Sequence, residues 1–206
     1  LKQSGHGDIE GLEADLWRDL QPDFRTSHYL DGFAHADGKF HFKADWPGVP
    51  MGHAGMMGRW QELPSLPDHC RTIEEADAEH PFRLATSPSR SFLNTTFNET
   101  PSSQAREGAP SVMIHPADAA ALGIGDGDAV TLGNMRGETT LTAKLFDGVL
   151  RGVLIAESVH PNRSHIGGRG INMLTGAEAV APVGGAAFHD NKVWIRKAAA
   201  EFQKQQ

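Results

Sequence analysis

The sequence from residue 116 to residue 130 reads Pro116-Ala117-Asp118-Ala119-Ala120-Ala121-Leu122-Gly123-Ile124-Gly125-Asp126-Gly127-Asp128-Ala129-Val130. Pro116 suits the first position of a helix, and Asp118 falls in the first turn, where the helix dipole favours a negative charge. Gly123 can adopt the left-handed conformation that ends a helix. The Gly-Asp-Gly-Asp segment that follows is typical of a turn. The stretch therefore predicts a short helix over 116–122, a tight turn and a strand from Ala129.

The glycines of this stretch do not form a nucleotide-binding fingerprint. The Gly-x-Gly-x-x-Gly pattern fails because its sixth position is Asp128, and a helix precedes it where a strand is required. A calcium-binding loop is excluded as well, because the bidentate Glu that such a loop needs at its last position is missing. The segment around Asp126 is therefore interpreted as a structural turn.

Short apolar runs on either side of this stretch predict further strands. Residues 139–145 alternate with a period of two, which places Thr139, Leu141, Ala143 and Leu145 on one face. A strand roughly every ten residues, with a single short helix, predicts a mainly β fold, a small β-barrel rather than a parallel α/β sheet. The predicted strands cover residues 82–86, 111–114, 129–132, 139–145, 153–155 and 192–196.

The first 80 residues differ in composition and are interpreted as the tail of a preceding domain and a connecting arm. Their aromatic residues are scattered among Gly, Pro and Asp, and the segment 47–67 has the composition of a loop. A short helix is predicted between Glu10 and Leu20, and a strand at Phe40–Phe42 after an Asp-Gly turn. The predicted domains are thus residues 1–80 and 81–206, and the sequence assigns no function to the first.

Charge and cysteine content exclude several classes of function. The net charge is −7, which disfavours binding to nucleic acid or to an anionic membrane. The single cysteine, Cys70, can form neither an internal disulfide nor an iron–sulfur site by itself, and is expected to be a small buried residue. No apolar run approaches the ~20 residues needed to cross a bilayer. No signal peptide is visible, and the missing initiator Met predicts that the chain is a processed product or an excised piece.

Residue chemistry alone indicates no catalytic site. His160 and His165 are too isolated to predict a metal site, and both the His-Glu-x-x-His and the Gly-x-Ser-x-Gly motifs are absent. The glycines at 167–170 and 184–185 lie in long segments without periodicity, where backbone can approach a bulky ligand. Taken without further comparison, the sequence predicts a small β-barrel with loops suited to ligand binding.

The order of segments in residues 82–196 resembles the molybdopterin-dinucleotide-binding domain that ends enzymes of the dimethyl sulfoxide reductase family. Four segments carry the resemblance: an apolar strand running into a Ser/Thr-rich loop, the stretch 116–130, an Arg-Gly turn, and an Asn-x-Leu-Thr element followed by a Phe-containing link. In this chain the first three are Leu84–Thr95, Pro116–Val130 and Arg136-Gly137. The fourth consists of Asn172–Thr175 and the link Ala187–Asp190. Two departures stand out: Ser87-Pro88 replaces the usual Gly of the loop, and His189 replaces the usual Lys.

The resemblance implies a double-psi β-barrel that caps a bis-molybdopterin guanine dinucleotide cofactor carrying molybdenum or tungsten. It also implies that the metal ligand and any iron–sulfur cluster lie in upstream domains of the same polypeptide, so no catalytic residue and no metal ligand is assigned here. His160 and Arg169 are implied as additional neighbours of the cofactor. The implied cofactor-binding residues are Thr86, Ser87, Ser89, Arg90, Ser91, Asn94, Thr95, Asn172 and His189.

The parent enzyme is then expected to transfer an oxygen atom or a hydride equivalent at the metal. The two departures suggest cytoplasmic bacterial members related to biotin-sulfoxide and assimilatory nitrate reductases. The upstream domains of the parent are the expected partners, and the isolated chain is expected to be inactive. Two alternatives stay open: a stand-alone β-barrel module that binds another nucleotide or phosphate ligand, and a structural or interaction domain without a cofactor.

Overall fold

The computed structural model describes residues 7–43, 45, 63–66, 68, 74–94, 96–177, 179–180 and 185–203. Contacts divide the chain into two units, residues 1–45 with 65–67 and residues 46–64 with 68–206. Each unit is described by itself. Cys70 lies outside the described residues, so the burial of its thiol stays a prediction.

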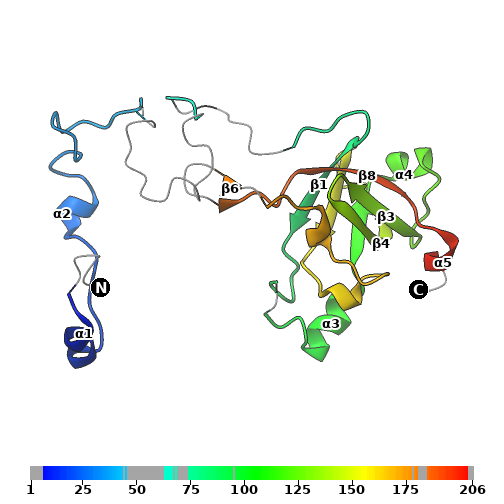
Figure 1. The fold of residues 1–206 in the computed structure, drawn as a ribbon, viewed down its shortest axis with the longest axis horizontal. Coiled ribbons are helices and arrows are strands. Elements are labelled where there is room, and N and C mark those ends of the chain that lie inside the picture. Colours follow the sequence, from blue (N-terminus) through cyan, green and yellow to red (C-terminus); the bar gives the residue numbers. More distant parts are fainter. Residues whose placement is uncertain are drawn as a thin grey trace. The chain divides into compact units, whose positions relative to one another are not determined.

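The first unit contains two short helices, α1 (Ile9–Asp15) and α2 (Phe24–Ser27) (Figure 1). The side chain of Asp8 caps α1 and that of Asp23 caps α2. The predicted helix between Glu10 and Leu20 is too long, because Leu16 adopts a left-handed conformation with φ of 64° and ends α1. An apolar stripe stabilises a helix only where another surface buries it, and α1 has no buried residue.

The turn predicted at Asp37-Gly38 is confirmed, but the strand predicted at Phe40–Phe42 is wrong. Gly38 has φ of 66° and its carbonyl accepts a hydrogen bond from the amide of Phe33. Beyond it, Phe40 contacts Phe33 and Phe42 edge to face, at centroid distances of 5.3 and 4.9 Å. A strand needs a partner strand for its backbone hydrogen bonds, and here Phe40 and Phe42 pack in local ring contacts instead.

The second unit is built on a closed barrel of six strands in the order β1-β5-β2-β4-β3-β8 (Figure 1). This confirms the mainly β fold and all six predicted strand positions. The strands are β1 (Phe82–Ser87), β2 (Ser111–Ile114), β3 (Ala129–Asn134), β4 (Gly137–Leu145), β5 (Val153–Glu157) and β8 (Asn191–Lys197).

The strand pairing has the internal symmetry of a double-psi barrel. The pairs β1·β5 and β2·β4 are parallel, and the other four barrel pairs are antiparallel. Replacing each strand by the one three places later in barrel sequence order reproduces the same neighbours and the same directions. The barrel therefore consists of two interlocked halves, and the predicted double-psi fold is confirmed.

The core fills the inside of the barrel. Alternate residues of the strands point inward, as the period of two predicts, and eight of the inward Leu, Ile and Val side chains are at most 2 % exposed. On the wall, Gly133 leaves room for a tryptophan, because a Cβ built there would lie 2.1 Å from the Trp194 ring. The eight inward residues are Leu84, Val112, Ile114, Val130, Leu132, Leu141, Leu154 and Val193.

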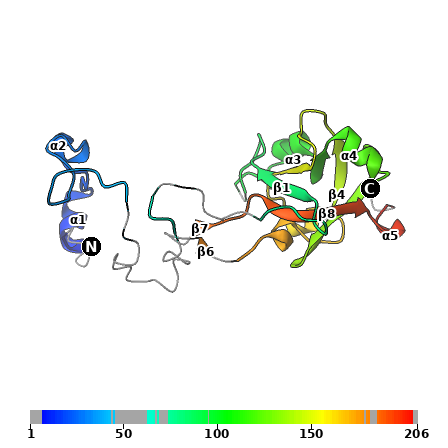
Figure 2. The same cartoon turned by 90° about the horizontal axis from the view of Figure 1, so that it is seen from above.

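Two helices mark the two ends of the barrel. Helix α3 (Pro101–Glu107) precedes β2 and α4 (Pro116–Ala121) follows it, so they lie at opposite ends of the barrel (Figure 1). Seen from above, both helices project on the same side of the barrel (Figure 2). Helix α4 confirms the helix predicted over 116–122. From the strand directions, the α3 end carries the strand termini Ser87, Ser111, Asn134, Gly137, Glu157 and Asn191, and the α4 end carries Phe82, Ile114, Ala129, Leu145, Val153 and Lys197.

The remaining elements are short and connect the strands. No helix among the described residues is both long and apolar enough to span a bilayer. Most of these elements lie between β5 and β8, where the sequence has little periodicity. They are η5 (Asn162–Ser164), η6 (Ile171–Leu174), the small β6 (Ala179–Val180) and β7 (Gly185–Ala186) pair, and the terminal α5 (Ala200–Gln203).

Candidate functional site

The acidic residues of the stretch 116–130 fasten the turns at the α4 end. Asp118 accepts hydrogen bonds from Arg151 Nε and from the Gly152 amide, both at 2.8 Å. Burial favours the neutral form of Asp118, but these two donors outweigh it and lower the pKa of the carboxyl group. Asp126 accepts from the Leu145 amide at 2.8 Å, in agreement with its interpretation as a turn residue.

Asp128 acts in the same way at the start of β3. Its carboxylate accepts from the Gly125 amide at 2.6 Å and forms an ion pair of 2.9 Å with Lys197 at the end of β8. The Gly125 amide and then Lys197 lower the pKa of Asp128. The most distinctive stretch of the sequence therefore builds the frame of the barrel, and the functional residues must be sought elsewhere.

At the α3 end, two predicted site residues meet although they are 103 positions apart. Thr86 Oγ1, near the end of β1, lies 3.2 Å from His189 Nδ1 and donates to the Phe188 carbonyl at 3.2 Å. The Phe188 carbonyl also accepts from Asn191 Nδ2 at 3.0 Å, and Asn191 is buried. The end of β1 and the link before β8 thus form one surface.

The loop after β1 is anchored to α3. Ser89 Oγ donates to the Phe92 carbonyl at 2.7 Å, and the Ser91 amide donates to Glu107 at 2.6 Å. The side chain of Arg90 is exposed, and Asn94 has a left-handed conformation with φ of 50°. Thr95 lies outside the described residues. Helix α3 thus holds the backbone of the loop in place, so that its exposed polar side chains can face a ligand.

Asn172 lies in η6, which is tied to the same end of the barrel. Asn134 Nδ2, at the end of β3, donates to the Leu174 carbonyl at 2.8 Å and to the Lys192 carbonyl at 3.5 Å. Through Asn134, η6 is joined to the start of β8, three residues from His189. The side chain of Asn172 itself is exposed, and its carbonyl accepts from Thr175 Oγ1 at 2.8 Å.

Burial disfavours the charged form of the two histidines in the β5–η6 segment and lowers the pKa of both. Burial and the nearby His160 lower the pKa of His165 to about 4, and burial also lowers the pKa of His160. His160 contacts the Phe92 ring edge to face at 5.0 Å. Nowhere in the described ranges do three or more His, Cys, Asp or Glu side chains form a group that could hold a metal ion.

Arg169 has an exposed side chain, and its carbonyl accepts from Thr139 Oγ1 at 2.6 Å.

Ser158 is a candidate that the sequence did not indicate. It follows β5 with φ of 69°, an uncommon conformation for a residue other than glycine, and its amide donates to the Ser87 carbonyl at 2.6 Å. Its buried Oγ has no hydrogen-bond partner among the described residues. A serine after a strand is commonly an ordinary turn residue, so only the structure reveals this unpaired hydroxyl beside the polar loop.

A pocket of about 260 Å³ opens beside this loop. Its walls combine the Phe92 and His160 rings with the polar side chains of Asn98, Gln104 and Ser164. It is smaller than the ~300–1,000 Å³ of most closed ligand sites. This pocket therefore encloses at most part of a large ligand.

A family profile described as molydopterin dinucleotide binding domain matches residues 82–193. The chain belongs to this family. The match covers the whole barrel up to β8 and confirms the resemblance to the dimethyl sulfoxide reductase family. It supports a molybdopterin cofactor, and nothing supports the alternative of a barrel without one.

Similar proteins of known sequence are much longer than this chain. It is 34% identical over 137 residues to the probable oxidoreductase YoaE of Bacillus subtilis, covering 66% of this chain and 19% of that protein. It is 33% identical over 100 residues to the dimethyl sulfoxide/trimethylamine N-oxide reductase of Rhodobacter capsulatus, covering 46% and 12%. Acetylene hydratase from Pelobacter acetylenicus has the same fold, with a TM-score of 0.59 and 15% identity over 81% of this chain and 24% of that one. The chain thus spans about a quarter or less of the length of these relatives.

The groups at the α3 end of the molybdopterin dinucleotide binding domain fit such a ligand. A dinucleotide presents a pyrophosphate and a base, which call for hydroxyl and amide donors and a few basic groups. The hydroxyls of Thr86 and Ser87, the exposed Arg90, and the unpaired Ser158 Oγ supply that set around one edge of the barrel.

Proposed function

We propose that this domain closes one side of a bis-molybdopterin guanine dinucleotide within a longer oxidoreductase. Upstream domains of the same polypeptide would hold the other side, the metal ligand and any iron–sulfur cluster. The contact of Thr86 with His189 is the observation that carries the proposal, because it joins two family segments from opposite ends of the domain into one surface. The small volume of the nearby pocket supports a shared site.

In this proposal the loop after β1 receives the pyrophosphate. Arg90 offers a guanidinium group and Asn94 offers an amide. Hydroxyl groups come from Thr86, Ser87, Ser89, Ser91 and Thr95. The Asn172 amide forms hydrogen bonds with the edge of a base or pterin. His189, which contacts Thr86, donates a further hydrogen bond to the ligand. His189 stands where the family has a lysine, so an imidazole ring nitrogen takes the place of an ammonium group as the donor. When bound, the cofactor supplies the two-electron chemistry, either oxygen-atom or hydride transfer.

Several further features of the parent enzyme belong to the proposal. The metal is molybdenum or tungsten, and one cysteine is too few for this chain to hold an iron–sulfur cluster alone. The parent is proposed to be a bacterial cytoplasmic enzyme. Fractionation of cells with an antibody against this chain would test the location, and elemental analysis of the purified enzyme would identify the metal.

The proposal predicts a difference between two mutations in the full-length polypeptide. Asn172→Ala should lower cofactor retention, because one lost hydrogen bond to a buried ligand group costs about 1–3 kcal/mol, or about 5- to 150-fold in affinity. Asp126→Ala changes a structural turn at the α4 end and should leave cofactor content unchanged. The readout is bound metal and acid-released guanine nucleotide per polypeptide. Equal retention by the two variants would contradict the site assignment.

A further inference from the structure

The segment before the barrel contributes the side chain of Glu74 to the α3 end. Glu74 accepts a hydrogen bond from the guanidinium of Arg136 on one carboxylate oxygen. On the other oxygen it accepts from the Lys192 amide at 3.1 Å. The Glu74 and Arg136 side chains are only 27% and 29% exposed, so this pair is partly shielded from solvent.

The first oxygen of Glu74 leads to η6. Arg136, in the β3–β4 turn, donates its other terminal nitrogen to the Leu174 carbonyl at 3.0 Å. Leu174 is the last residue of η6 and is fully buried. Glu74 therefore orients the guanidinium that holds the element carrying Asn172.

The second oxygen of Glu74 leads to the link before β8. Lys192 follows Asn191, whose side chain donates to the Phe188 carbonyl at 3.0 Å. That carbonyl also accepts from Thr86, next to the contact between Thr86 and His189. Fixing the Lys192 amide therefore fixes the strand start from which Phe188 and His189 are positioned.

We propose that Glu74 is a positioning residue of the dinucleotide site, holding η6 and residues 187–190 in a fixed relation to each other. The inference rests on the proposed function. Glu74 contacts both routes to the site, one with each oxygen. By comparison, Asp77 binds the Lys192 side chain at 2.5 Å and so reaches only the second route. The two routes meet again at Asn134, which ties the Leu174 and Lys192 carbonyls together.

The experiment compares three variants of the 206-residue chain with the wild type. Glu74→Ala removes both acceptors. Glu74→Gln keeps one acceptor oxygen and places an NH₂ group against the other donor, so it serves one route only. Glu138→Gln is the matched control, because it neutralises a carboxylate that forms a surface ion pair of 3.3 Å with Arg196 and contacts neither route.

Two measurements separate positioning from general stability. Backbone amide chemical shifts of residues 171–175 and 187–191 are recorded without ligand, and GDP, which carries a guanine and a pyrophosphate, is then titrated into each folded variant. We expect both segments to shift together in Glu74→Ala. The dissociation constant of GDP should rise about tenfold in Glu74→Ala and about threefold in Glu74→Gln. Glu138→Gln should behave as the wild type.

Unchanged shifts in either segment would overturn the proposal. So would shifts in both segments with an unchanged affinity for GDP, since Glu74 would then be a structural residue only. Failure of the wild type to bind GDP would count against the donors assigned to this chain, and this outcome is separate from the role of Glu74. The shifts then decide alone, where a joint movement of the two segments supports the role of Glu74 and its absence refutes it.

Discussion

Asp118 is a nearly buried carboxylate that serves two donors of the β4–β5 turn, Arg151 and Gly152. Asp118→Asn leaves one acceptor oxygen and turns an NH₂ group toward these donors. We expect the free energy of unfolding at pH 7 to fall by about 1–3 kcal/mol, measured by urea denaturation. The exposed Asp147 provides the control, and Asp147→Asn should change stability by less than about 0.5 kcal/mol.

The same substitution has a pH signature. The pKa of Asp118 is lowered in the folded state, so its stabilising contribution is present above the ordinary value of 3.8 and is lost as the pH falls through the folded pKa. The stability difference between wild type and Asp118→Asn should therefore shrink below about pH 4. A difference that stays constant from pH 7 to pH 3 would contradict the assigned ionic role.

His165 makes an opposite kind of contribution, as a buried base kept neutral. Its pKa is lowered from 6.5 to about 4, so between these values the unfolded chain binds more protons than the folded one. The contribution of His165 to the free energy of unfolding should be fully present above pH 6.5. Between pH 6.5 and pH 4 the free energy of unfolding should fall by about 1–2 kcal/mol, after allowance for solvent screening.

The test is His165→Gln, followed by urea denaturation at several pH values across this window. The variant should lose the pH-dependent part of the stability that His165 contributes. His28→Gln, on the exposed surface of the first unit, is the matched control and should retain the wild-type profile. If His165→Gln and the wild type show the same pH dependence, His165 does not contribute in this way.

At the scale of elements, the strands could be predicted because each buries one face in a single core. Leu84, Leu141 and Leu154 sit on the inward positions that the period of two selects. The same logic failed at Leu16, which takes a left-handed conformation and is 85% exposed. A periodic pattern predicts an element only if a second surface exists to cover it, and the described α1 has no buried residue.

Elements of the candidate site were predictable only in part. The family resemblance picked out Thr86 and His189 separately, and the barrel topology brings them together. Glu74 could not have been found, because its two contacts lie 62 and 118 positions away and depend on the fold. Ser158 depends on a backbone angle that no sequence pattern specifies.

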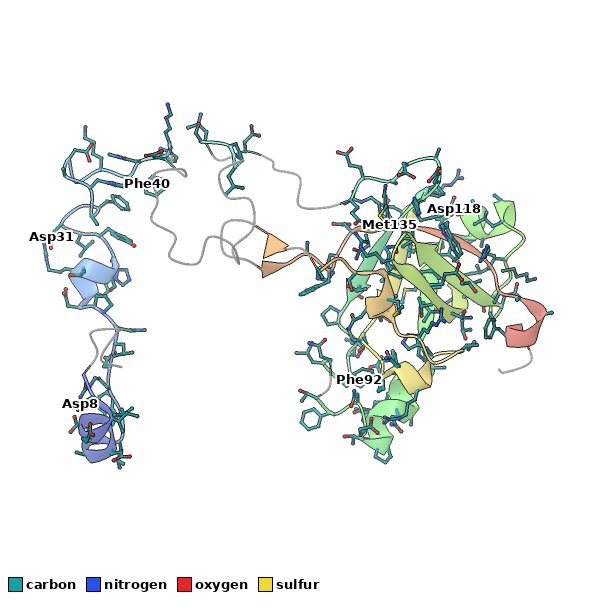
Figure 3. The ribbon with its side chains drawn as sticks, viewed as in Figure 1. Asp8, Asp31, Phe40, Phe92, Asp118 and Met135 are labelled. Carbon is teal, nitrogen blue, oxygen red and sulfur yellow. The ribbon has the colours of Figure 1, made fainter. Side chains whose placement is uncertain are left out.

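At the scale of the whole barrel, structure and function occupy opposite ends. Asp118 lies at the α4 end and Phe92 at the α3 end, as Figure 3 shows. The three aspartates that fasten turns all act at the α4 end, whereas Thr86, His189, η6 and the pocket lie at the α3 end. The stretch that best identifies the family therefore stabilises the barrel, while the less distinctive loops are the ones proposed to contact the ligand. Mutations at the two ends should separate stability from cofactor binding.

This division also bears on what the chain can do by itself. The described residues include no group of His, Cys, Asp or Glu side chains that could hold a metal ion. The α3 end carries the proposed donors for a dinucleotide, and the pocket of about 260 Å³ beside them is smaller than most closed ligand sites. We therefore expect the purified 206-residue chain to show no oxidoreductase activity with artificial electron donors and to contain no stoichiometric molybdenum or tungsten. Joining it to the upstream domains should restore both, because the cofactor would then be held from two sides. One bound metal ion per isolated chain, found by elemental analysis, would refute the shared-site proposal.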